Sequence, residues 1–221
     1  MEIRTIVNSL IDLFFPMRCI HCSDVIASTQ ILCVPCSTHL PYTHWELNQN
    51  NKAFRQLYQY CRVEAAYSLL HFSKRNVTQS LLHEMKYKAR PEIGALLAAK
   101  VNIDLSGYDG IIPVPLHPKR LKQRGYNQVA DFTKKLAEIH SLPYLDQILI
   151  RNRFNSSQVF KNKRDRIQSL NNAFQLLNPE INGHYIIVDD LITTGATLSQ
   201  AIVPFNANNG VKVSVITIAC A

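Results

Sequence analysis

Two adjacent carboxylates stand directly before a turn that is rich in hydroxyl groups. Asp189 and Asp190 end a run of apolar and aromatic residues, 185–188, that is typical of a buried strand in a parallel sheet. The residues that follow them are Leu191, Ile192, Thr193, Thr194, Gly195, Ala196 and Thr197. A helical pattern begins at Leu198. A loop between a strand and a helix directs backbone N–H groups at one point, so this segment predicts a phosphate site.

The carboxylates restrict which phosphate compound would fit. Two negative charges beside a phosphate repel it unless they hold another part of the same molecule, such as sugar hydroxyls or a divalent ion. Other phosphate motifs are missing, because the sequence contains neither a Gly-x-x-x-x-Gly-Lys-[Ser/Thr] loop nor a Gly-x-Gly pair. The segment therefore predicts a phosphate compound that carries sugar hydroxyls, or a diphosphate bound through a divalent ion. The plain alternative is a buried strand with an acidic turn and no ligand.

Four of the six cysteines form a pattern that suits a metal ion. Two Cys-x-x-Cys pairs, separated by ten residues, consist of Cys19, Cys22, Cys33 and Cys36. Four thiolates in two such pairs are typical of a tetrahedral Zn²⁺ site, and disulfides are the alternative. Four sulfur ligands leave no open position, so the expected role of the zinc is structural. Cys61 and Cys220 are expected to be thiols of the core.

Two basic stretches accompany the acidic loop. The first contains four cations between residues 119 and 124, and it follows an expected strand. A guanidinium group suits pyrophosphate because its planar fork can bind two oxygens at once. The second stretch contains Arg151, Arg153, Lys161, Lys163, Arg164 and Arg166. The formal net charge of +8 also favours anionic partners, including nucleic acid, although either stretch could be ordinary solvated surface.

Strands and helices are expected to alternate along the chain. The apolar patterns predict a strand or hairpin over 63–72 and strands over 111–115, 148–150, 186–188 and 211–219. They predict helices over 77–88, 91–101 and 127–140, and a further helix from 198 that Pro204 should kink or shorten. This order indicates an α/β fold with a mainly parallel central sheet flanked by helices, whose ligands bind beyond the carboxyl ends of the strands.

Two domains are expected. Residues 1–45 should hold an amphipathic helix and the four-cysteine module, and residues 46–221 the α/β domain. The polar residues 46–60 suggest a linker. No apolar run reaches the ~18 residues of a membrane span, and the N-terminal helix lacks the features of a signal peptide. We therefore expect a cytoplasmic protein without membrane insertion.

The acidic loop resembles the phosphoribosyl pyrophosphate (PRPP) loop of type I phosphoribosyltransferases. The whole chain resembles the ComF family of bacterial competence proteins, which join a cysteine-rich ribbon to a phosphoribosyltransferase domain. The resemblance runs through both Cys-x-x-Cys pairs, Lys86-Tyr87, Val114-Pro115, the Arg-Gly-Tyr-Asn-Gln motif at 124–128, Arg151, Arg166 and the loop 189–197. It implies a type I phosphoribosyltransferase fold with a small N-terminal zinc ribbon.

The resemblance also implies residue roles. Asp189 and Asp190 would hold the ribose hydroxyls, and residues 193–197 the 5′-phosphate, with Mg²⁺ bound to PRPP. Pyrophosphate would lie beside Lys86, Tyr87, Pro115, Arg120 and Arg124. The basic stretch 151–166 would form the flexible hood loop over PRPP, with contacts to DNA as a further role.

Two functions follow from the resemblance. The first is a PRPP-binding protein of natural transformation that handles single-stranded DNA, together with other competence proteins such as a DNA helicase or translocase. Tyr126, Phe154 and Phe160 are its candidates for stacking on bases, or else they are core residues. The alternative is an active phosphoribosyltransferase that transfers ribose 5-phosphate to an unidentified acceptor.

Overall fold

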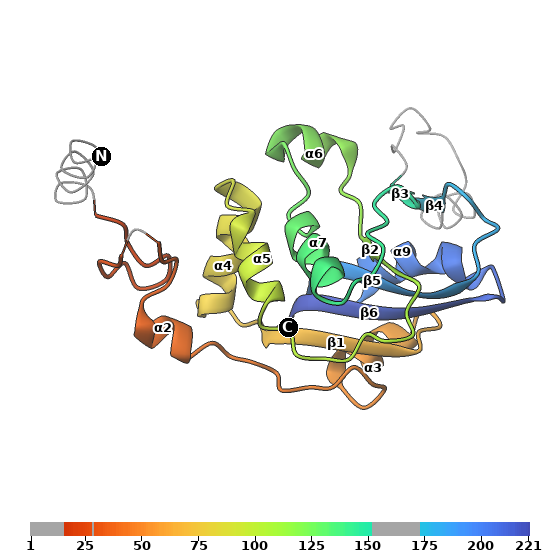
Figure 1. Ribbon diagram of the computed structural model, residues 1–221, viewed down its shortest axis with the longest axis horizontal. Coiled ribbons are helices and arrows are strands. Elements are labelled where there is room, and N and C mark those ends of the chain that lie inside the picture. Colours follow the sequence, from red (N-terminus) through yellow and green to blue (C-terminus); the bar gives the residue numbers. More distant parts are fainter. Residues whose placement is uncertain (1–15, 28, 152–172) are drawn as a thin grey trace, which may run out of the picture.

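The computed structural model describes residues 16–27, 29–151 and 173–221. Its centre is a four-stranded parallel sheet (Figure 1). The strands are β1 (Ala65–His71), β2 (Gly110–Pro113), β5 (Gly183–Ile192) and β6 (Val211–Cys220). Their order is β1-β6-β5-β2, and every neighbouring pair is parallel. All four carboxyl ends therefore face the same edge, and the two long central strands carry residues toward it.

Helices cover both faces of this sheet. The helices on one face are α4 (Val77–Tyr87), α5 (Glu92–Ala98) and α7 (Ala130–Ile139), and those on the other are α3 (Lys52–Tyr58) and α9 (Ala196–Asn206). Side chains of β5 alternate between the two layers, because Ile186 and Val188 pack with the first group and Tyr185 and Ile187 with the second. Burial on both faces explains why the strand is apolar without interruption.

Smaller elements complete the described chain. They are α2 (Val34–Thr38), α6 (Pro118–Arg124), β3 (Leu149–Arg151) and β4 (Phe174–Leu176). The last two strands form a separate antiparallel pair. In Figure 1, α6 stands above the sheet, and α2 belongs to the cysteine-containing segment at the far end from β3 and β4. None of the described helices has the length and apolar character that crossing a membrane requires.

The predicted fold class is confirmed. The sheet is parallel, helices flank it, and four cysteines cluster near the N-terminus, as expected of a type I phosphoribosyltransferase fold with an added cysteine module. The expected N-terminal amphipathic helix lies outside the described residues.

The expected linker at 46–60 is wrong in its second half, because this segment contains α3. Asn51 caps the helix by accepting a hydrogen bond from the Phe54 amide at 3.0 Å. Ala53, Phe54 and Leu57 are buried against the sheet. The asparagine that suggested a loop is thus a helix cap, and it also donates to the Ala66 carbonyl at 2.6 Å.

Two further expectations differ from the structure. Residues 118–124 lie in none of the predicted helices, yet they form α6, which begins with Pro118 and is followed by the C-cap Gly125 in a left-handed conformation (φ +78°). Pro204 was expected to kink or shorten the helix after the acidic loop, but α9 continues to Asn206. Pro204 lies in the last turn of α9, and only Phe205 and Asn206 follow it in the helix.

Candidate functional site

The acidic loop lies at the carboxyl end of β5, in the middle of the sheet. Asp189 and Asp190 belong to the strand itself, and α9 begins at Ala196. Gly195 is the N-cap residue, and its backbone has a φ of +80°. A Cβ at this position would meet the Gln56 carbonyl oxygen of α3 at 2.9 Å. Glycine is therefore required twice, by the left-handed backbone and by the close approach of α3.

The turn presents donors to the solvent. Thr193, Thr194 and Thr197 are exposed, whereas Gly195 is buried against α3. The N-cap is a glycine and has no side chain to cap the helix, and the Ala196 amide makes only a long hydrogen bond of 3.4 Å to the Thr194 hydroxyl. The turn is held from below, since the Gln56 side-chain amide donates to the Thr193 carbonyl. Open amides at the N-terminus of an eleven-residue helix, beside three hydroxyl groups, can bind a phosphate.

Asp190 contacts two other segments of the chain directly and a third through Gln128. Its carboxylate lies 2.7 Å from the Lys86 ammonium group of α4 and accepts a hydrogen bond from the Gln128 amide at 3.1 Å. Arg124 in turn donates to the Gln128 side-chain oxygen at 2.7 Å. Asp190 and Gln128 are both buried, with exposures of 6% and 5%. These partners satisfy a carboxylate that would otherwise be costly to bury.

Gln128 is a site residue that sequence reasoning did not assign. It appeared only as the last residue of the motif 124–128, with no role attached. Its contact with Asp190 joins residues 62 positions apart, so no local pattern could reveal it. The one available signal was a polar side chain directly before the apolar helix that starts near Ala130.

Asp189 differs from its neighbour in its electrostatics. Burial, together with the negative charge of Asp190, raises the pKa of Asp189 to about 7. The amide of Asp190 donates to its carboxylate at 2.8 Å and acts in the opposite direction, as does the positive charge of Lys86. The pair thus contains one acid that is compensated by an ion pair and one that is poorly compensated.

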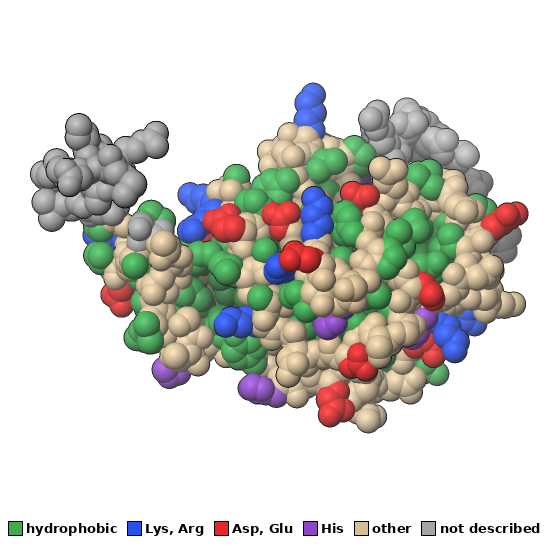
Figure 2. Space-filling model, viewed as in Figure 1, with side chains coloured by type: hydrophobic (Ala, Val, Ile, Leu, Met, Phe, Trp, Pro, Cys, Tyr) green, Lys and Arg blue, Asp and Glu red, His purple; other side chains and the backbone are tan. Residues whose placement is uncertain are grey.

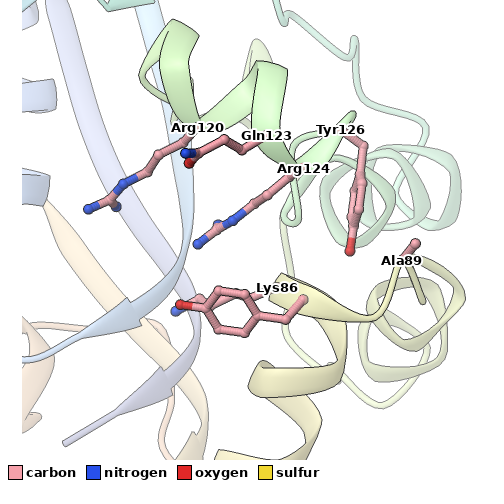
Figure 3. Close-up of a pocket in the computed structure, with 7 residues that line it drawn as sticks. Lys86, Ala89, Arg120, Gln123, Arg124 and Tyr126 are labelled. Carbon is pink, nitrogen blue, oxygen red and sulfur yellow. The ribbon is translucent and has the colours of Figure 1, made fainter.

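A cavity of about 600 Å³ opens between α4 and α6, next to the acids. Its lining residues are Lys86, Tyr87, Ala89, Arg120, Gln123, Arg124 and Tyr126. Figure 3 shows Arg120 and Arg124 reaching down from α6, with Lys86 opposite them at the end of α4. No carboxylate stands among these lining residues, so the described walls favour an anion.

Four of the five residues expected at pyrophosphate line this cavity. They are Lys86, Tyr87, Arg120 and Arg124. Pro115 does not, because it lines a neighbouring cavity of about 530 Å³. The two cavities share Tyr126, whose hydroxyl group donates to the Met85 carbonyl.

Arg151 also lies close to the acids. Burial, and then the positive charge of Arg120, lowers its pKa, whereas the charge of Asp189 acts in the opposite direction. Its guanidinium lies 5.0 Å from the centre of the Phe174 ring. The remaining residues assigned to the hood, Arg153, Lys161, Lys163, Arg164 and Arg166, lie outside the described residues.

The four cysteines form one cluster whose sulfur atoms all lie within 4.8 Å of one another. The Sγ atoms of Cys22 and Cys33 are 3.5 Å apart. Tetrahedral sites with metal–sulfur bonds of ~2.3 Å place sulfur atoms ~3.8 Å apart, so the residues present fit a metal ion such as zinc. Burial alone would raise the pKa of Cys19, but backbone N–H groups that point at its sulfur, led by that of Cys22, lower it to about 6. A thiolate at this position suits a metal.

The sheet and the loop at its edge define a phosphoribosyltransferase-type α/β protein, with a cysteine module before it. Curated relatives then point to a particular family. The chain is 29% identical over 196 residues to DNA utilization protein YhgH of Escherichia coli O157:H7, covering 82% of this chain and 81% of that protein. It is 37% identical over 109 residues to Competence protein F of Haemophilus influenzae, covering 48% of each. These relatives confirm the resemblance to the ComF family.

Other comparisons are more distant. DNA utilization protein YhgH of Salmonella typhimurium is 34% identical over 129 residues, 54% of this chain and 57% of that protein. No protein-family model matches the chain. Among solved structures, the chain is similar to UMP synthase of Leishmania donovani, with 17% identity and a TM-score of 0.36 over 63% of this chain and 24% of that chain. Glutamine PRPP amidotransferase from B. subtilis gives 21% identity and a TM-score of 0.36 over 57% and 25%. Likenesses this distant carry no argument of their own.

A zinc ion in the cysteine cluster would hold α2 to the preceding turn. The variant Cys33→Ser is therefore expected to contain less zinc than the wild-type protein, measured by elemental analysis after purification, and to melt at a lower temperature. The matched control is Cys61→Ser, whose thiol lies outside the cluster. A wild-type protein without metal and with the same melting temperature as Cys33→Ser would contradict this assignment.

The raised pKa of Asp189 predicts how stability depends on pH. A carboxyl group whose pKa is higher in the folded protein than in the unfolded chain costs stability as the pH rises from ~4 toward ~7. Asp189→Asn removes that cost. The difference between the free energy of unfolding of the variant and that of the wild-type protein should therefore increase, in favour of the variant, from about pH 5 to about pH 8. The gain amounts to a few kcal/mol at most, since one pKa unit corresponds to ~1.4 kcal/mol. Urea unfolding at both pH values measures it, and equal differences at the two would show that the pKa is ordinary.

Proposed function

We propose that this protein binds PRPP at the carboxyl end of β5 and acts in natural transformation, where it handles single-stranded DNA in the cytosol. The observation that carries the proposal is the meeting of three features at one sheet edge. These are the adjacent acids Asp189 and Asp190, the open N-terminus of α9 behind Gly195, and the cationic cavity between α4 and α6. Each suits a different part of the same molecule.

The three parts of PRPP match these features in order. The 5′-phosphate would bind the amides and hydroxyls of residues 193–197, and the ribose hydroxyls would bind the acids. The diphosphate would reach the cations Lys86, Arg120 and Arg124, with Arg151 alongside. Two adjacent carboxylates are hard oxygen donors, so they fit the Mg²⁺ that PRPP carries, and the ion would add positive charge beside the diphosphate.

Relatives support the role in DNA uptake. One is named DNA utilization protein and the other Competence protein F, and these names support a role in the use of DNA and in competence. The net charge of +8 favours a polyanionic partner as well. Within this proposal the four-cysteine cluster holds structural zinc, because its sulfur spacing fits a tetrahedral site with no open position.

The second candidate function is transfer of ribose 5-phosphate to an acceptor. The cationic cavity favours it, because Arg120 and Arg124 would stabilise the negative charge of a departing diphosphate. The acceptor itself has no identified binding residue among the described ones. Release of pyrophosphate from PRPP in the presence of candidate bases tests this function. A protein that binds PRPP but releases none with any base would be a binding module.

The variant Asp189→Ala/Asp190→Ala should lose affinity for PRPP, because both groups proposed to hold the ribose are removed. Calorimetric titration with PRPP and Mg²⁺ is expected to show at least a tenfold weaker affinity, about 1.4 kcal/mol. Glu180→Ala, which removes an exposed acid before the opposite, amino end of β5, is the control. Circular dichroism checks that the double variant is folded. A folded double variant with wild-type affinity would refute the PRPP site.

A further inference from the structure

The cavity between α4 and α6 has an aromatic wall that a diphosphate does not need. Tyr87 is the last residue of α4, and its side chain is 65% exposed. His83, one turn earlier, is also exposed, and the centres of the two rings lie 5.0 Å apart. Tyr58, on α3, is equally exposed, so exposure alone does not mark a site. What distinguishes Tyr87 is that it lines the cavity, where its ring face can stack on a planar group of a ligand.

Cations stand next to this aromatic surface. The Arg124 guanidinium carbon lies 5.3 Å from the centre of the Tyr87 ring. Arg120, one turn earlier on the same face of α6, forms no ion pair with any described carboxylate. Helix α6 carries no acidic residue, and none of its side chains is buried. Figure 2 shows one Lys or Arg side chain projecting at the top of the molecule, where α6 lies.

An exposed ring beside Arg120 and Arg124, neither of which forms an ion pair with a described carboxylate, matches the chemistry of a single-stranded nucleic acid. Its bases have free faces that stack on aromatic side chains, and its phosphates bind the neighbouring cations. A duplex offers only phosphates here, because its bases are already stacked on one another. An inorganic diphosphate would bind the cations, but it has no planar group that could stack on the Tyr87 ring.

The structure also changes which aromatic residue would stack. Tyr126 was the candidate from the sequence, but its hydroxyl group donates to the Met85 carbonyl and its ring is partly buried between the two cavities. Phe154 and Phe160 lie outside the described residues. Tyr87 is more exposed than Tyr126, and a guanidinium group lies beside its ring. Of these two residues, Tyr87 is therefore the one that a base can reach.

We propose that the cavity between α4 and α6 binds single-stranded DNA, with one base stacked on Tyr87 and a backbone phosphate at Arg120 and Arg124. This deepens the proposed function and rests on it in one respect, because the same arginines are assigned to the diphosphate of PRPP. Strand and PRPP therefore exclude each other from the cavity.

The first experiment separates stacking from charge. Fluorescence anisotropy would compare a labelled oligothymidylate with an abasic strand of the same length. The wild-type protein should prefer the strand with bases by about tenfold, since stacking of one base contributes ~1–3 kcal/mol. Tyr87→Leu should abolish the preference, and Tyr87→Phe should keep it. Equal affinity of the wild-type protein for both strands, or a preference that survives in Tyr87→Leu, would overturn the proposal.

The second experiment uses the two faces of α6. Arg120 lines the cavity, whereas Lys119 and Lys122 are exposed and do not line it. The variant Arg120→Gln should weaken strand binding severalfold and reduce the slope of log affinity against log salt by about 0.7, the value for one phosphate contact with a single strand. Lys119→Gln is the charge-matched control on the same helix. A control that loses as much affinity as Arg120→Gln would show general attraction to a basic surface and no specific site.

The third experiment separates this proposal from the PRPP site itself. PRPP with Mg²⁺ should displace the labelled strand from the wild-type protein, and the Asp189→Ala/Asp190→Ala variant should resist that displacement. If PRPP binds by calorimetry without displacing the strand, the shared cavity is wrong while the PRPP site stands. If PRPP does not bind at all, the proposed PRPP function fails, and the test of Tyr87 with abasic strands still decides whether the cavity binds DNA.

Discussion

The ion pair between Lys86 and Asp190 is the contact on which the rest of the site depends. A carboxylate that is only 6% exposed needs partners, and this one draws them from separate parts of the chain. Lys86 comes from the end of α4, and Gln128 from the segment before α7. Through Gln128 the network reaches Arg124 on α6. Burial of one acid at the end of β5 thus positions both walls of the cationic cavity.

The site contains charges that favour a ligand even before one binds. Burial and the charge of Asp190 raise the pKa of Asp189, which shows that its negative charge is poorly compensated. Burial and the charge of Arg120 likewise lower the pKa of Arg151, so positive charges are crowded on the other side. Sugar hydroxyls can donate to the acids, and phosphates can accept from the arginines. A ligand with both groups compensates the negative charge of the acids and the positive charge of the arginines, whereas a simple anion compensates only the arginines.

The parts of this site that are local in sequence were predictable, and the parts made by distant contacts were not. The strand with its two acids, the glycine turn and the Cys-x-x-Cys pairs each follow from neighbouring residues. Helix α3 was missed because its seven residues offer too few turns for a pattern and because Asn51 resembles a loop residue. The role of Gln128 and the exposure of Tyr87 depend on how α4, α6 and α7 pack, which no short stretch of sequence encodes.

Sharing of the arginines would link two ligands through simple competition. If a diphosphate and a backbone phosphate both require Arg120 and Arg124, only one of them can occupy the cavity at a time, so each raises the apparent Kd of the other in proportion to its own concentration over its own Kd. No change of shape is needed, because the cavity walls are already held in place by the network around Asp190. A rise in PRPP then releases the strand, and an abundant strand excludes PRPP. In this scheme PRPP controls DNA binding without any transfer reaction, because its binding in the cavity is enough to release the strand.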